Sequence, residues 1–208
     1  MSATERMQPC PGDRTDRAAS IIRTFATEYG WAGSLPDFDH IPVLVAPDRA
    51  TLEDYLRDIG ELTGEAPAGL VAASLPGGIV IADVAGVQAV RPEYLAIDQG
   101  WIRLLAHEFA HLLHENLVGG KEELLGPRWF FEGFACLAAG QRLGRDFAGR
   151  PAAEVFEAVK VVGREQYPVY EAALRYFAAQ VPLPQLVDHA GEDGFEAWLS
   201  GVLEPPPG

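Results

Sequence analysis

The sequence predicts an α+β fold, with strands in the first half of the chain and helices in the second. β-rich segments lie within residues 41–46 and 70–84, whereas apolar residues recur at helical spacing after residue 98. Because strands and helices are segregated along the chain, an α+β arrangement is favoured over a doubly wound α/β fold. The 208 residues, 48% of them hydrophobic, suit a single globular domain.

The first half begins with a polar stretch, residues 1–17, that contains Pro9, Pro11 and Gly12. We expect a disordered lead there and a single domain over residues 18–208. Apolar spacing then predicts helices, β-rich runs predict strands, and a Pro-Gly-Gly turn joins two of those runs into a hairpin. The expected elements are a helix over 18–29, a strand over 41–46, a helix over 51–59 and paired strands over 70–74 and 78–84.

The second half contains the clearest helical pattern of the chain, residues 98–116, which Gly119 and Gly120 end. A second helix is expected over 127–140, because a proline near its start and a glycine at its end are typical of helix boundaries. Shorter helices are expected over 151–163, 170–180 and 195–199.

The charge balance restricts the classes of partner. The chain has 30 acidic and 16 basic residues, a net charge of −14, and no cluster of Lys or Arg. A nucleic-acid partner and an anionic membrane surface are therefore disfavoured. The N-terminus lacks the apolar core of a signal peptide, and Cys10 and Cys136 form no disulfide framework. A cytoplasmic location is expected, although a secreted protein trimmed of its signal would have the same features; the oligomeric state stays open.

The motif that carries chemistry is the HExxH sequence His107-Glu108-Phe109-Ala110-His111. Residues four apart lie on one face of a helix, so His107 and His111 can bind one zinc ion together. Glu108 points about 100° away around the helix and can reach a water beside the metal, as a general base must.

A catalytic zinc site needs a third protein ligand. The metzincin pattern would require glycine at position 114 and histidine at 117, where this chain has His114 and Leu117. A carboxylate on the following helix is the other common arrangement, and Glu132 stands alone among Trp129, Phe130, Phe131 and Phe134. Because a cation removes the cost of burying a lone carboxylate, Glu132 is the expected third ligand.

The sequences HEFAH and PRWFFEGFACLAAG together resemble the gluzincin metallopeptidases, within them the peptidase MA-like families. The resemblance covers about residues 40–200. It implies a zincin-like fold, in which a small mixed or antiparallel sheet packs on an active-site helix. It also implies one zinc ion per chain, bound by His107, His111 and Glu132. It also implies that an edge strand, expected at Gly78, Ile79, Val80 and Ile81, pairs with an extended peptide substrate.

One position departs from the gluzincin pattern, and the identity of one further functional residue stays open. Cys136 stands four residues after Glu132, where relatives such as thermolysin have an aspartate that orients the first histidine. A downstream tyrosine is expected to stabilise the oxyanion, with Tyr167 as first candidate and Tyr170 and Tyr176 as rivals.

Other polar residues of this region receive structural interpretations. His114 is interpreted as a hydrogen-bonded histidine near the helix end. The remaining acidic residues nearby are expected to be solvated charges: Glu115, Glu122 and Glu123.

The expected function is hydrolysis of peptide bonds in a peptide or protein substrate by a zinc-activated water, with Glu108 as general base. The alternative is a zincin-like module that binds metal or peptide with little or no activity, which Cys136 favours slightly and the intact Glu108 disfavours. A helical protein without metal is the third interpretation.

Overall fold

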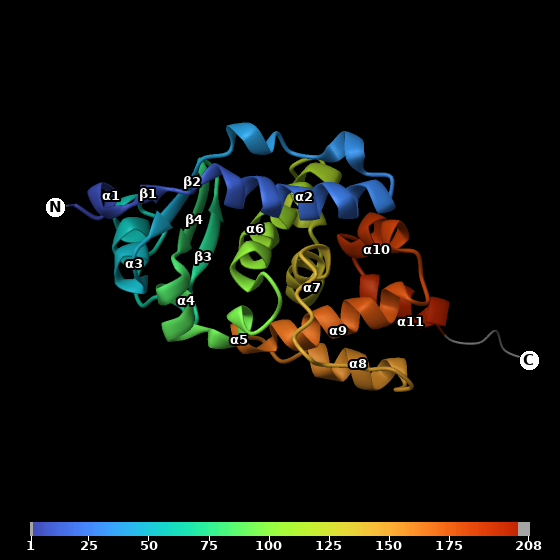
Figure 1. The fold of residues 1–208 in the computed structure, drawn as a ribbon. Coiled ribbons are helices and arrows are strands. Elements are labelled where there is room, and N and C mark those ends of the chain that lie inside the picture. The colour runs from blue at the N-terminus through green and yellow to red at the C-terminus, as the bar shows by residue number, and fades with distance from the viewer. Residues whose placement is uncertain (1, 204–208) are drawn as a thin grey trace, which may run out of the picture.

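A four-stranded mixed sheet forms one end of the molecule, and helices form the rest (Figure 1). The structure, a computed structural model, describes residues 2–203. The sheet has the order β1-β2-β4-β3. Its strands are β1 (Gln8–Pro9), β2 (Val43–Ala46), β3 (Ala72–Leu75) and β4 (Gly78–Ala82). The predicted α+β class is confirmed.

The helices include those expected around the HExxH motif and after it. They are α1 (Ala3–Arg6), α2 (Gly12–Glu28), α3 (Arg49–Asp58), α4 (Val84–Val90), α5 (Pro92–Leu95), α6 (Gly100–Leu117), α7 (Arg128–Ala138), α8 (Ala152–Val159), α9 (Tyr167–Ala178), α10 (Leu183–Ala190) and α11 (Phe195–Leu203). The predicted helices over 98–116 and 127–140 are confirmed as α6 and α7. The short helices α1, α4, α5 and α10 were not expected from the sequence.

The hairpin is confirmed, but its strand at the edge of the sheet is β3 and not the expected β4. Strand β4 pairs in parallel with β2 and antiparallel with β3, so it is internal, and β3 is the edge strand. The run Ile79–Ala82 is fully buried, which explains its unbroken apolar sequence. The expectation that Gly78, Ile79, Val80 and Ile81 form an edge open to substrate is therefore wrong.

The expectation of a disordered lead over residues 1–17 is also wrong for the described residues 2–17. Strand β1 pairs antiparallel with β2, placing Gln8 opposite Val45. The Arg6 side chain donates to Thr51 Oγ1 and Asp54 Oδ2, each at 2.9 Å. These tertiary contacts order a segment whose polar composition alone gives no reason to fold.

Helix α6 lies in the middle of the core, between the sheet and α7 (Figure 1). Its residues Leu105, Phe109 and Leu113 are completely buried. Trp101 at its start donates its indole N–H to the Ala82 carbonyl at the end of β4, at 2.9 Å. The amphipathic spacing recognised in the sequence therefore fixes α6 against the sheet.

Helices α7 and α9 approach closely because α7 carries a glycine where they meet. A Cβ atom on Gly133 would lie 2.7 Å from the carbonyl oxygen of Tyr170. Any larger residue would push α9 away from α7. Because the glycine lets the two helices approach, the start of α9 reaches the side chain of Glu132, the residue just before Gly133 in α7.

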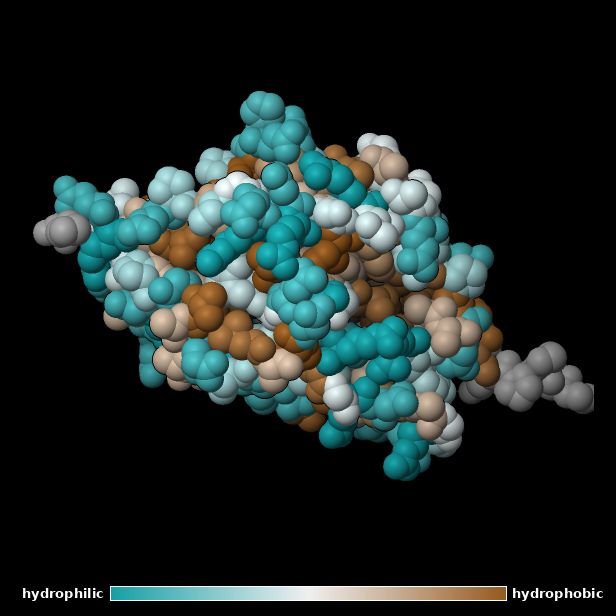
Figure 2. All heavy atoms as spheres, viewed as in Figure 1, coloured by the Kyte–Doolittle hydropathy of each residue, from teal (hydrophilic) through white to brown (hydrophobic). Residues whose placement is uncertain are grey.

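The face drawn in Figure 2 is mostly hydrophilic, with hydrophobic residues in scattered patches. Acidic residues outnumber basic ones in the chain as a whole. None of the helices in the described part of the chain is both long enough and apolar enough to cross a membrane.

Candidate metal centre

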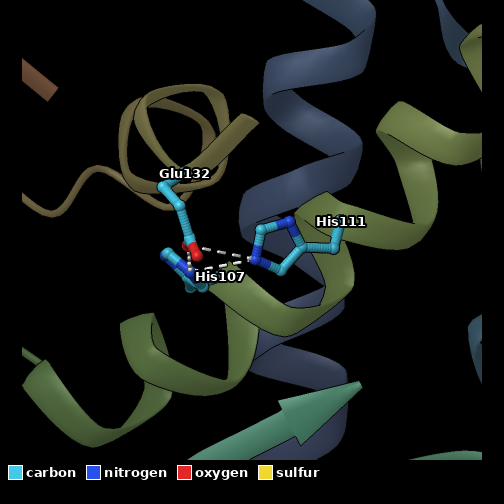
Figure 3. A group of neighbouring side chains, drawn as sticks. All are labelled: His107, His111 and Glu132. Carbon is cyan, nitrogen blue, oxygen red and sulfur yellow. Dashed lines mark hydrogen bonds and ion pairs between the residues drawn. The ribbon is translucent and has the colours of Figure 1, made fainter. Parts of the chain in front are cut away.

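The two histidines of the HExxH motif lie one turn apart on the same face of α6 and point toward α7 (Figure 3). Their Nε2 atoms are 3.1 Å apart, and both side chains are buried. Two Nε2 atoms this close repel each other unless a proton or a metal ion lies between them. Burial lowers the pKa of His107, but the neighbouring Cys136, Glu132 and Glu108 outweigh burial and raise that pKa well above its ordinary value. The pair of rings therefore favours a cation between them.

Glu132 completes the group from α7. Its Oε2 atom is 3.4 Å from His107 Nε2 and 3.6 Å from His111 Nε2. Among the described residues this buried oxygen accepts no hydrogen bond. Burial raises the pKa of Glu132, but the two imidazoles beside it outweigh burial and hold the pKa well below its usual range. The carboxylate is therefore charged and free to act as a ligand.

The spacing of the three ligand atoms fits a tetrahedral metal site. They all lie within 4.8 Å of one another, and their closest separations are 3.1, 3.4 and 3.6 Å. Ligands at about 2.0–2.1 Å from a tetrahedral zinc ion lie about 3.3–3.4 Å from each other. These side chains could therefore hold a zinc ion with little movement, which agrees with the ligand set expected from the sequence.

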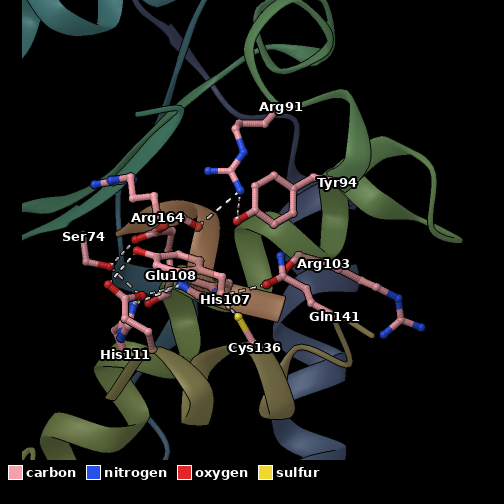
Figure 4. A network of polar contacts seen from close by, with 12 residues as sticks. Ser74, Arg91, Tyr94, Arg103, His107, Glu108, His111, Cys136, Gln141 and Arg164 are labelled. Atoms are coloured by element: carbon pink, nitrogen blue, oxygen red, sulfur yellow. Dashed lines mark hydrogen bonds and ion pairs between the residues drawn. The ribbon is translucent and has the colours of Figure 1, made fainter. Parts of the chain in front are cut away.

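His107 is oriented by a residue that the sequence did not reveal. Its Nδ1 lies 3.0 Å from Gln141 Oε1, and the Gln141 amide in turn donates to the Arg103 carbonyl at 3.3 Å (Figure 4). Because the amide oxygen must face His107, Nδ1 carries the proton and Nε2 is left for a metal. Gln141 therefore orients His107, the role for which the sequence offered no aspartate at position 136.

Cys136 lies beside the same ring, with Sγ 3.6 Å from His107 Nδ1. Burial raises the pKa of this thiol, so it is neutral and contributes a weak contact rather than a charge. His111 has no hydrogen-bond partner for Nδ1 within the described chain; its ring stacks on Phe131 at a centroid distance of 4.1 Å. The two histidines are therefore held by different means, one by a hydrogen bond and one by packing.

Glu108 faces the edge strand. Its Oε2 atom accepts a hydrogen bond of 2.9 Å from Ser74 Oγ on β3, which also contacts the Glu108 carbonyl at 3.2 Å. This contact links α6 to β3. Ser74 was not singled out in the sequence, because nothing in a strand of four residues reveals which helix it faces.

Among the three tyrosine candidates, Tyr167 is the one that reaches the centre. Its hydroxyl donates to Glu132 Oε1 at 2.6 Å, and its ring stacks on His107 at a centroid distance of 5.7 Å. Burial and the neighbouring Glu132 raise its pKa, so the hydroxyl keeps its proton. Tyr170 and Tyr176 donate instead to the carbonyls of Val161 and Arg150, away from the centre.

A cavity of about 250 Å³ opens over these residues. One wall is β3 and the segment before it, another is α6, and the third is formed by Phe131, Arg164 and Tyr167. Strand β4 contributes no residue to this wall. The surface that faces the candidate metal ligands is therefore the edge strand β3.

Two interpretations of polar residues near the motif are corrected. His114 is completely buried, and within residues 2–203 neither ring nitrogen has a hydrogen-bond partner; its ring stacks on Phe134 at 4.4 Å. Burial and the nearby His111 lower the pKa of His114 to about 3, so it is a neutral packing residue. Glu115 is half-buried and lines the cavity, where burial raises its pKa.

No protein family, no curated protein and no solved structure matches this chain.

Proposed function

We propose that this chain is a zinc-dependent peptidase of the gluzincin type, built on a zincin-like fold. The observation that carries the proposal is the buried group of His107, His111 and Glu132, with Glu108 beside it at the wall of the same cavity. Two imidazole nitrogens and one carboxylate oxygen are a donor set typical of catalytic zinc. The HExxH and WFFEGFA sequences support the same assignment.

Zinc bound by these three groups would polarise the carbonyl of a substrate and acidify a water molecule beside it. The chain's own residues supply the rest of the chemistry. Gln141 and Tyr167 hold two of the ligands in place, through Nδ1 of His107 and Oε1 of Glu132. Their hydrogen bonds fix the ligands before a metal arrives.

Glu108 is the proposed general base. Its carboxylate lines the cavity and accepts only one side-chain hydrogen bond from the described residues, that of Ser74 Oγ. It can accept a proton from water as the water oxygen attacks the peptide carbonyl carbon. It then returns that proton to the leaving nitrogen as the C–N bond breaks, which yields a carboxylate and an amine. The Tyr167 hydroxyl has one proton, which it donates to Glu132 Oε1, so its proposed role is to position that ligand; the donation to the oxyanion expected from the sequence would require the hydroxyl to leave Glu132.

Strand β3 is the proposed docking strand for an extended peptide. The Val71 carbonyl accepts from the Ala82 amide at 2.8 Å, so residues 71, 73 and 75 direct their main-chain groups toward β4. Ala72 and Ser74 therefore direct theirs toward the free edge. A peptide added there would lie over Glu108 and the candidate metal ligands.

The proposal is tested by incubating the protein with a peptide library, with and without a zinc chelator, and analysing the products by mass spectrometry. Hydrolysis that stops with chelator and returns with zinc is the expected result. Glu108→Gln should retain zinc and lose turnover, whereas Glu65→Gln, an exposed control, should hydrolyse like the wild type. Undiminished hydrolysis by Glu108→Gln would overturn the assignment of the base. Bound zinc without any hydrolysis by the wild type would instead favour a metal-binding or peptide-binding module.

A further inference from the structure

Arg164 is the one lysine or arginine among the described residues that line the cavity. Its side chain is half-buried and forms no ion pair or hydrogen bond with any residue from 2 to 203. Other basic residues of the described chain also lack an ion pair, and what sets Arg164 apart from them is its place on the wall of this cavity. A guanidinium group placed in a cavity without a protein partner is available to bind an anionic group of a ligand.

The main chain around Arg164 is fixed although its side chain is free. Arg91 donates from Nη2 to the Arg164 carbonyl at 3.4 Å and to the Tyr94 hydroxyl at 3.2 Å (Figure 4). Tyr170 holds the preceding loop by donating to the Val161 carbonyl at 2.7 Å. Arg91 is itself buried and paired with Glu93, so its own charge is already balanced. The loop therefore presents Arg164 to the cavity in a defined place.

The position of Arg164 along β3 indicates which part of a substrate it meets. Ser74, near the end of β3, contacts Glu108. Gly69, just before the start of β3, lies against Arg91: a Cβ atom there would be 2.7 Å from Arg91 Nη1. Because Arg91 also holds the Arg164 carbonyl, Arg164 belongs to the end of the cavity where β3 begins.

Antiparallel pairing, the more stable kind, would run a peptide from the Ser74 end of β3 toward Val71. The residues after the cleaved bond would then approach Arg164. We propose that Arg164 binds a carboxylate on the C-terminal side of the cleaved bond, so that preferred substrates carry one there. The planar guanidinium group matches a carboxylate with two parallel hydrogen bonds. This inference rests on the proposed peptidase function for the cleavage step, but not for binding.

Two sources of carboxylate have the same chemistry: the C-terminus of a short peptide, and the side chain of Asp or Glu. The test uses N-terminally labelled, alanine-rich pentapeptides in four versions, which are the free acid, the amide, an amide with Asp near the C-terminus and its Asn counterpart. Hydrolysis is measured with the wild type, and binding with zinc-loaded Glu108→Gln by fluorescence anisotropy. Both are repeated with Arg164→Gln, Arg164→Lys and, as a control of equal charge change, the exposed Arg128→Gln.

We expect at least one carboxylate peptide to bind about ten- to a hundredfold tighter than its neutral partner, the range for charge-assisted hydrogen bonds. Arg164→Gln should abolish this difference without weakening the neutral peptide, Arg164→Lys should retain part of it, and Arg128→Gln should leave it unchanged. The pair that discriminates identifies the source of the carboxylate. Equal binding within both pairs, or equal losses for acid and neutral peptides in Arg164→Gln, would overturn the inference.

This experiment distinguishes failure of the proposed peptidase function from failure of the proposed carboxylate site at Arg164. Discrimination in binding that depends on Arg164, with no hydrolysis by the wild type, would refute the peptidase and keep the carboxylate site. Hydrolysis of all four peptides at equal rates, with equal binding, would keep the peptidase and refute the site. Neither binding nor hydrolysis of any version would refute both.

Discussion

Gln141 offers a specific test of how the candidate metal site is held together. It lies just beyond α7, is completely buried, and accepts from His107 Nδ1 at 3.0 Å. Replacement by leucine keeps a side chain of similar size but removes the acceptor. His107 then loses the hydrogen bond that fixes its proton on Nδ1 and its ring in place.

The expected effect is that of a single hydrogen bond to a metal ligand. Removing such a bond from a ligating histidine weakens metal binding about ten- to a hundredfold, or about 1.4–2.7 kcal/mol. The Cys136 thiol at 3.6 Å is too weak an acceptor to replace it. Zinc affinity is measured by competition with a chromophoric chelator, with Gln180→Leu as an exposed control of the same chemical change.

Gln141→Glu separates orientation from packing, because it keeps an oxygen acceptor at the same position. It should bind zinc at least as tightly as the wild type, whereas Gln141→Leu should bind more weakly. Equal affinity of wild type and Gln141→Leu, with both folded by circular dichroism, would refute the orienting role. A loss in Gln141→Glu as large as in Gln141→Leu would refute it as well.

Two further predictions concern buried groups around the centre. His114, with a pKa lowered to about 3, stays neutral in the folded protein while it titrates in the unfolded chain near 6.5, so protonation favours unfolding as the pH falls below 6.5. Between about pH 8 and pH 5 the free energy of unfolding of the metal-free wild type should therefore fall by about 2 kcal/mol more than that of His114→Phe, as measured by urea unfolding. The same pH dependence in both proteins would contradict the buried, neutral state. Tyr167→Phe should bind zinc about tenfold more weakly, because Glu132 Oε1 loses its 2.6 Å hydrogen bond; chelator competition that gives the wild-type affinity would show that this contact does not position the ligand.

The features predicted correctly from the sequence are those that depend on local spacing. His107 and His111 share a helix face because residues four apart do so on any helix, and Glu132 stands out because it is a lone carboxylate among aromatic residues. The Pro-Gly-Gly turn between the two β-rich runs predicts the hairpin. These signals need no knowledge of which elements pack together.

The features missed depend on contacts between distant segments. Strand order cannot be read from a hairpin, because either of its strands could be the edge until β2 pairs with β4. Gln141 and Ser74 are 34 residues away from the side chains they contact, and nothing in their local sequence marks them. The N-terminal segment folds because β1 finds β2, not because its composition favours structure.

The central claim is that His107, His111 and Glu132 hold a catalytic zinc ion, and metal content tests it most directly. Protein purified after growth with added zinc should contain about one zinc per chain by inductively coupled plasma mass spectrometry. Glu132→Ala should contain much less, because removal of a ligand leaves only the two histidines, while Glu65→Ala, an exposed site, should match the wild type. Zinc near zero in the wild type, or full zinc in Glu132→Ala, would contradict the account.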